Sequence, residues 1–205
     1  MKKYFLLFSF VFTSCLNNNI DYNFLNTEFN SFEKGKNLKI FYFSEGSKQF
    51  LLKTNTMESF EDYVLVTKNY TQACIPDSTF SDFDLQKINQ DTLQNISVFS
   101  DSVLIINYNN LGDSIFQVSA EKIINYSDED IVELKKNVVL KNNNNNILKT
   151  NHLFWNIEKK KLLSLDSVII QTSDKTIYGC GLYSDDNFEN YQIYNIRGEI
   201  DIDTD

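Results

Sequence analysis

Few side chains in this sequence could carry out chemistry, and their types narrow the reactions open to it. His152 is the single histidine among 205 residues, which excludes a His-rich metal cluster and any mechanism that needs two imidazoles. His152 and Cys180 would supply a base and a nucleophile, but no nucleophile motif accompanies them. The acidic groups at Asp128–Asp130 and Glu199–Asp205 lack the ligand spacing of a calcium loop and are interpreted as solvated charge. We expect no catalytic residue, no metal site and no cofactor.

The overall charge excludes some partners. The chain carries 28 acidic and 19 basic side chains, which gives a net charge of −9. Affinity for nucleic acid comes mostly from Lys and Arg that neutralise phosphates, so we expect no nucleic acid partner. The 14% aromatic content supplies apolar area for a buried core, and the length suits one or two domains.

The N-terminus has the pattern of an export signal. Two lysines precede an apolar run over Tyr4–Ser14, which is about half of the roughly 20 residues that a membrane-spanning helix needs. The run ends in Phe12-Thr13-Ser14 before Cys15, which resembles the lipobox of bacterial lipoproteins, although Phe12 stands where Leu is usual. The alternative is an ordinary secretory signal in which Cys15 is incidental.

From this pattern we expect three parts: a signal peptide over 1–14, a lipidated tether over 15–30 that begins at Cys15, and a single domain over 31–205. The mature protein would be a periplasmic body anchored to a membrane by lipid. The other thiols, Cys74 and Cys180, could pair in an oxidising compartment, but they lie far apart in sequence and free buried thiols are the preferred interpretation.

The rest of the chain predicts an all-β fold. Short segments rich in Ile, Val, Phe, Tyr and Thr alternate with turn residues every eight to twelve positions, and helical periodicity is nearly absent. The Asn142–Asn146 tract is interpreted as a turn between two strands. The predicted strands are Leu38–Phe43, Tyr63–Val66, Val103–Tyr108, Ile115–Tyr126, Ile131–Leu140, Ile147–Trp155, Leu162–Ile170 and Tyr191–Ile196.

An internal repeat of about thirty residues organises these strands. Val118–Leu140 aligns without gaps on Leu148–Ile170, each copy being strand, turn and strand. A looser third copy begins at Ile177, and Leu52–Asn55 repeats Leu148–Asn151 letter for letter. A hairpin of this size cannot bury its apolar face alone, so the copies must stack on their neighbours.

Strand alternation assigns an inner face to these copies. The inner residues on two successive strands are Phe116, Val118, Ala120, Ile124 and Tyr126, followed by Val132, Leu134, Val138 and Leu140. Lys122 and Lys136 share their parity, so each is expected at a rim or a bulge.

Four stretches in the second half carry a family resemblance: Asn137–Leu140, Ile147–Asn156, Ser167–Ile170 and Ile177–Asp185. In order and spacing they resemble the "GNV", "L-x-T-x-x-L-x-W/Y-D", "V-x-I" and "I-x-G-x-G-L-x-S/A-D" elements of the LptC family, the periplasmic component of lipopolysaccharide export. Lys136 replaces the Gly of the first element, and a lipobox replaces the transmembrane helix that many members carry. The resemblance covers about Val103–Ile200, with a fainter extension back to Leu38.

The resemblance implies an elongated antiparallel β-jellyroll of stacked hairpin repeats, with two facing sheets and an open apolar groove. It implies a non-enzymatic component that takes lipopolysaccharide from an inner-membrane ABC transporter of the LptB/LptF/LptG type and passes it to an LptA-type protein by edge-strand pairing. The alternative is a membrane-tethered structural or adhesive β-repeat lipoprotein with a closed core. The residues expected to line the groove are Phe116, Val118, Ile124, Val132, Leu134, Val138, Leu148, Leu153, Trp155, Val168, Ile170 and Ile177.

Overall fold

The computed structural model describes residues 31–44, 46–64, 75, 82–83, 85 and 92–197. The predicted signal peptide, the lipidated Cys15, the tether and the acidic tail from Glu199 lie outside these residues, and so does Cys74.

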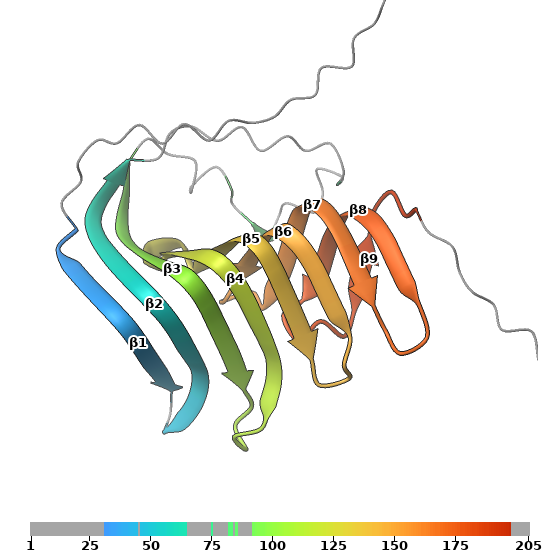
Figure 1. Ribbon diagram of the computed structural model, residues 1–205, viewed down its shortest axis with the longest axis horizontal. Coiled ribbons are helices and arrows are strands. Elements are labelled where there is room, and N and C mark those ends of the chain that lie inside the picture. Colours follow the sequence, from blue (N-terminus) through green and yellow to red (C-terminus); the bar gives the residue numbers. More distant parts are fainter. Residues whose placement is uncertain are drawn as a thin grey trace, which may run out of the picture.

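The described chain forms one antiparallel sheet in which each strand pairs with the next in sequence (Figure 1). The sheet does not close on itself, so β1 and β9 are its two edges. The all-β prediction is confirmed, and the two facing layers expected from the sequence are two halves of this one sheet. The strands are β1 (Glu33–Ser44), β2 (Ser47–Val64), β3 (Thr92–Tyr108), β4 (Ser114–Tyr126), β5 (Ile131–Asn142), β6 (Ile147–Asn156), β7 (Lys161–Gln171), β8 (Thr176–Asp185) and β9 (Tyr191–Ile193).

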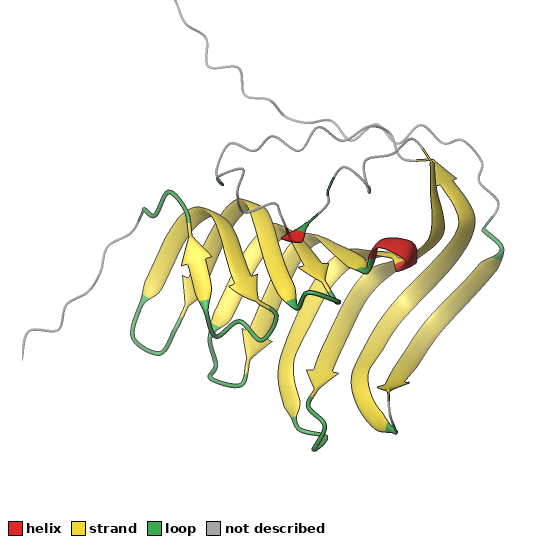
Figure 2. Cartoon of the chain, turned by 180° about the vertical axis from the view of Figure 1, so that it is seen from behind, coloured by secondary structure: helices red, strands yellow, loops and turns green. Residues whose placement is uncertain are grey.

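A line of irregularities crosses the sheet and folds it. In the six successive pairings from β2–β3 to β7–β8 the register shifts near mid-strand. Left-handed backbone occurs at the same level, at Asn37, Asp101, Ser102, Lys136, Asn137 and Gly181. A bulge bends its strand and increases the local twist, and Figures 1 and 2 show the long strands curving together so that the sheet folds over.

The fold line divides the sheet into two halves, which we name leaf 1 and leaf 2. Leaf 1 ends at the β1–β2, β3–β4, β5–β6 and β7–β8 turns and comprises residues 38–44, 47–53, 103–119, 138–150 and 167–180. Leaf 2 comprises residues 33–36, 56–64, 92–100, 122–135, 154–164, 182–185 and 191–193.

The letter-for-letter repeat marks this fold line. The Thr54 hydroxyl lies 2.8 Å from the Thr56 carbonyl oxygen and 2.9 Å from that of Ser100 on the next strand. The Thr150 hydroxyl occupies the equivalent place and lies 2.9 Å from the Ser167 carbonyl oxygen on β7. Both threonines thus satisfy backbone groups that the irregular register would otherwise leave unpaired.

Candidate lipid-binding interior

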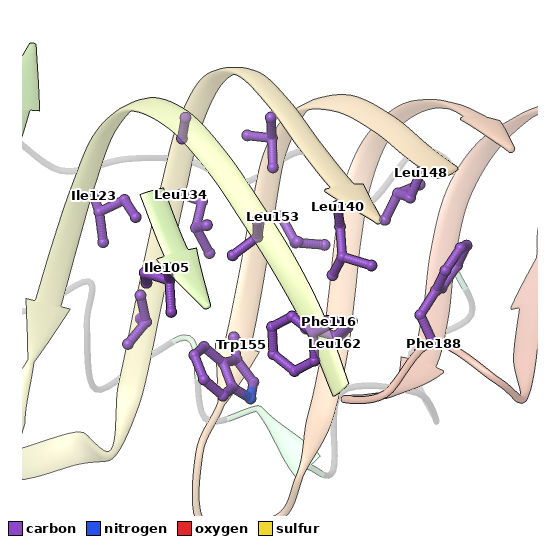
Figure 3. Close-up of a cluster of buried hydrophobic side chains, with 14 of the residues drawn as sticks. Ile105, Phe116, Ile123, Leu134, Leu140, Leu148, Leu153, Trp155, Leu162 and Phe188 are labelled. Carbon is purple, nitrogen blue, oxygen red and sulfur yellow. The ribbon is translucent and has the colours of Figure 1, made fainter. Parts of the chain in front are cut away.

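The two leaves enclose a continuous apolar cluster, which we call the interior. It extends from β2 to β8, and Figure 3 shows side chains from several strands directed into it. Its members include Leu134, Val138, Leu140, Leu148, Leu153, Leu162 and Ile170, all at most 1% exposed. In this structure the interior side chains pack against one another.

The structure brings most of the predicted groove residues into this interior. Ten of the twelve belong to the interior cluster and an eleventh, Ile177, packs against it half-buried. Lipid contact by these residues stays a prediction. Sequence reasoning omitted other members that the repeat pointed to, among them Ile123, which aligns with Leu153, and Leu182 in the third copy.

The placement of Ile124 on the inner face was wrong. Ile124 and Tyr126 belong to a second cluster on the opposite face of leaf 2. The register shift between Ser119 and Lys122 reverses the alternation of β4, so that Ile123 rather than Ile124 points inward. Lys122 and Lys136 do lie at the irregularities, where they were expected.

Trp155 holds an unpaired polar group in the interior. Its indole ring meets the Phe116 ring edge-on at 5.5 Å between centroids, and this contact joins leaf 2 to leaf 1. The residue is 5% exposed, and its Nε1–H has no hydrogen-bond partner. Because leaving a buried donor unpaired costs about 1–3 kcal/mol, the interior offers one hydrogen bond to any acceptor that enters.

The second cluster, which we call the outer cluster, covers leaf 2 on the side away from the interior. It joins strand residues such as Ile96, Ile131 and Phe154 to Ile75, Phe83 and Leu85 of the connection between β2 and β3. Tyr183 hydrogen-bonds Asp82 of this connection. Burial, together with that carboxylate, raises the pKa of Tyr183 to about 12.

A buried carboxylate on this outer side engages the single histidine. Glu133 is fully buried and accepts from the Tyr126 hydroxyl at 2.6 Å. Its other oxygen lies 2.7 Å from His152 Nε2 and 2.9 Å from Lys135 Nζ. Burial, followed by repulsion from Lys135, lowers the pKa of the nearby Lys122. These contacts compensate the burial of a charge, which is a structural use of His152.

Cys180 is disulfide-bonded, so the preference for free thiols was wrong. The other cysteines, Cys15 and Cys74, lie outside the described residues. A disulfide-bonded Cys180 has no thiolate, and the pairing of this residue with His152 as nucleophile and base therefore lacks its nucleophile.

Next to Cys180 the backbone of residues 193–194 lies close to β8. The Cys180 N–H donates to the Tyr194 carbonyl oxygen at 2.9 Å. A Cβ built on Gly179 would stand 2.1 Å from Ile193 Cγ2, so only glycine permits this approach. Gly181 has a positive φ of 91°, a backbone conformation that glycine adopts without strain.

The opposite edge of the sheet is exposed. β1 presents three consecutive aromatic residues near its end, Phe41, Tyr42 and Phe43, which are 44%, 50% and 59% exposed. Tyr42 stacks on Phe50 at 4.8 Å, and Lys39 lies over the Phe41 ring. A pocket of about 550 Å³ near this edge is lined in part by Lys36, Met57 and Val98. Met57 packs against the interior and Val98 belongs to the outer cluster, so the lining draws on both clusters.

Residues 38–201 match the model of a family described as LptC: lipopolysaccharide-assembly, LptC-related. The chain belongs to this LptC-related family. Membership supports a role in lipopolysaccharide transport and a periplasmic location associated with the inner membrane. No curated protein sequence matches the chain.

Two features are absent from the described part of the chain. None of its helices has the length and apolar character needed to cross a membrane. Its His, Cys, Asp and Glu side chains form no group that could hold a metal ion.

Proposed function

We propose that this protein binds lipopolysaccharide by burying its acyl chains between leaf 1 and leaf 2. Burial of apolar surface is worth about 0.8 kcal/mol per methylene, so acyl chains cannot cross an aqueous compartment bare. The observation that carries the proposal is the interior itself, which runs along the sheet from β2 to β8 inside a sheet that does not close. The free ends of leaf 1 and leaf 2 can move apart without breaking the hydrogen bonds between paired strands.

The chemistry of the interior suits the linkage of an acyl chain as well as its hydrocarbon. The unpaired Trp155 Nε1–H would donate to an ester or amide carbonyl, or to a hydroxyl, at the head of a chain. The sugars and phosphates would stay in water, because the interior is built from apolar side chains. Binding therefore depends on acyl burial, and sugar phosphates without acyl chains should not compete.

In this proposal the protein receives lipid from an inner-membrane ABC transporter and passes it to a neighbouring β-jellyroll. The two edge strands, β1 and β9, offer backbone groups for pairing with such neighbours. Of the predicted terminal strand Tyr191–Ile196, only Tyr191–Ile193 forms a strand, β9. The backbone beyond it continues alongside β8 to a bridge between Arg197 and Tyr178. Attachment by a lipid on Cys15 is part of the same proposal.

The rival function is a tethered structural or adhesive protein, for which the tightly packed interior is the specific support. Two adjacent aromatic residues on β6 separate the two functions. Trp155 faces the interior and Phe154 faces the outer cluster, and both are buried. Replacing each in turn with a photoactivatable phenylalanine, in cells that make lipopolysaccharide, tests which face meets lipid.

We expect a lipopolysaccharide adduct from position 155 and none from position 154. Equal adducts from both positions, or none from either in a folded protein, would remove the support for lipid binding between the leaves. Photoactivatable residues at Phe41 on β1 and Gln192 on β9, with the exposed Lys149 of β6 as control, would show whether the sheet edges meet partner proteins.

A further inference from the structure

The connection between β8 and β9 crosses the free ends of both leaves. We call Asp186–Asn190 the latch loop. Its first residue donates from the Asp186 N–H to the Lys160 carbonyl oxygen at 3.0 Å, in the β6–β7 turn at the end of leaf 2. Two residues later, the Phe188 carbonyl oxygen accepts from Asn142 Nδ2 at 2.9 Å, at the end of leaf 1. The loop thus spans the side on which the leaves would part.

This loop inserts a side chain between the leaves. Phe188 is fully buried and belongs to the interior cluster (Figure 3). Its ring stacks on Tyr191 with 5.1 Å between centroids. The phenyl group is an apolar body that comes from a loop rather than from a strand, so it can leave the interior without disturbing the sheet.

The closed loop holds several groups in unfavourable states. Phe188 adopts a φ of 55°, in the left-handed region that bulky residues avoid. Asn187 Oδ1 is buried and has no hydrogen-bond partner. Burial raises the pKa of the Asp186 carboxyl. Each of these costs is relieved when the loop moves into water.

We propose that the latch loop gates the interior, with Phe188 filling the place of an acyl chain until lipid displaces it. This inference rests on the proposed function and adds the route by which lipid enters. Acyl chains of lipid A would enter between the ends of β5 and β8 as the loop swings away, and the unpaired Trp155 N–H would then meet its acceptor. The sheet itself keeps its pairing throughout.

A substitution at Asn142 can weaken the hydrogen bond that holds the latch loop closed. Its Oδ1 accepts from the N–H groups of Asn144 and Asn146 and shapes the β5–β6 turn, while its Nδ2 holds the loop. Asn142→Asp keeps the turn acceptor and sets a carboxylate oxygen against the Phe188 carbonyl oxygen. Asn144→Asp is the matched control, because it adds the same charge two residues away on an exposed side chain.

Two measurements on the full mature chain test the proposal. Hydrogen exchange should show the amides of residues 186–190 exchanging about tenfold faster in Asn142→Asp than in Asn144→Asp, as expected for the loss of one hydrogen bond to a now repelled group. Stopped-flow uptake of lipid A that carries a fluorescent acyl chain should accelerate by a similar factor. Phe188→Ser, which withdraws the plug, provides a second variant with the same expected direction.

The outcomes separate this inference from the proposed function. Uptake by the unmodified protein, with identical rates in all three variants, would overturn the latch and leave lipid binding standing. Faster loop exchange without faster uptake would also overturn it as a gate. No uptake by any variant, including the unmodified chain, would overturn the proposed function, and the loop would then have no lipid to admit.

Discussion

The two ends of the folded sheet differ in how completely they close the interior. At the β7–β9 end, Val168, Leu182 and Phe188 are at most 1% exposed, and Cys180 carries a disulfide. Ile193 and Tyr194 lie so near β8 that Gly179 has no room for a side chain. At the β1–β2 end, Ile40, Phe50 and Met57 are half-buried, as Ile177, Tyr191 and Ile193 are at the other end. The difference lies deeper, because Leu52 of β2 is still 5% exposed whereas Leu182 of β8 is fully buried.

This difference gives the body a direction. The edge strand β1 is 12 residues long and β9 is 3, so β1 offers the longer regular strand for pairing. The exposed aromatic residues Phe41, Tyr42 and Phe43 lie on that same strand. A body that is sealed at one end and open at the other suits a carrier that admits its cargo by one route and releases it by another.

The largest expected effect concerns burial along leaf 1. Leu148→Ala on β6 should lower the free energy of unfolding by about 3 kcal/mol, because it leaves a cavity in a fully buried site. Ile40→Ala on β1 should cost about 1 kcal/mol, since its surroundings are partly open to water. Chemical denaturation measures both values, and equal costs would mean that the first end is as tightly packed as the middle.

Glycine substitutions compare the two ends directly. Gly179→Ala should lower the free energy of unfolding by about 2 kcal/mol, because the new Cβ meets Ile193 at 2.1 Å and the Tyr194 carbonyl oxygen at 3.0 Å. Gly35→Ala meets the tip of Leu38 at 2.5 Å, and a flexible side-chain end can turn away. Its cost should stay under about 0.5 kcal/mol. A reversed order in thermal unfolding would contradict the picture of a tight C-terminal end.

A smaller effect tests the polar group in the interior. Trp155→Phe removes the unpaired N–H and keeps an aromatic ring against Phe116. We expect little change in unfolding temperature and about a fivefold weaker affinity for lipid A, which corresponds to about 1 kcal/mol for one hydrogen bond. Titration of labelled lipid A gives the affinity. Leu162→Met, a change of similar volume in the same cluster, should leave it unaltered.

The local pattern of apolar residues in the sequence predicted much of this fold. The thirty-residue repeat placed equivalent residues correctly: Val132 with Leu162, and Val138 with Val168, all lie in the interior. Alternation within one strand failed for Ile124 because a bulge lies between it and Phe116. The repeat predicted the correct face for Ile124, since it aligned Ile124 with Phe154 and both belong to the outer cluster.

Local sequence patterns did not predict two parts of the structure. Most of β2 and the first half of β3 were missed because their charged and polar residues, such as Glu58 and Ser100, break the apolar runs. The contact between Asn142 and Phe188 joins residues 46 positions apart. Nothing local distinguishes Asn142 from the rest of its asparagine tract, and its role depends on how the leaves meet.

The smallest effect concerns the pH at which the sealed end opens. Burial raises the pKa of the Asp186 carboxyl above its usual 3.8; the neighbouring Asp185 carboxylate adds to the increase, and Lys160 opposes it. The closed loop therefore holds the proton more tightly than the open loop does. Closure is favoured in acid and weakens as the pH rises from about 4 through the raised pKa of this group.

We expect the amides of residues 186–190, after correction for intrinsic exchange, to open more often at about pH 7 than at about pH 4. Asp186→Asn removes the carboxyl, so it should abolish this difference and hold the loop closed at both pH values. If the pH dependence persists in Asp186→Asn, the titration of another group causes it. Burial of the Asp186 carboxyl would then be no reason for the sealed end to open as the pH rises.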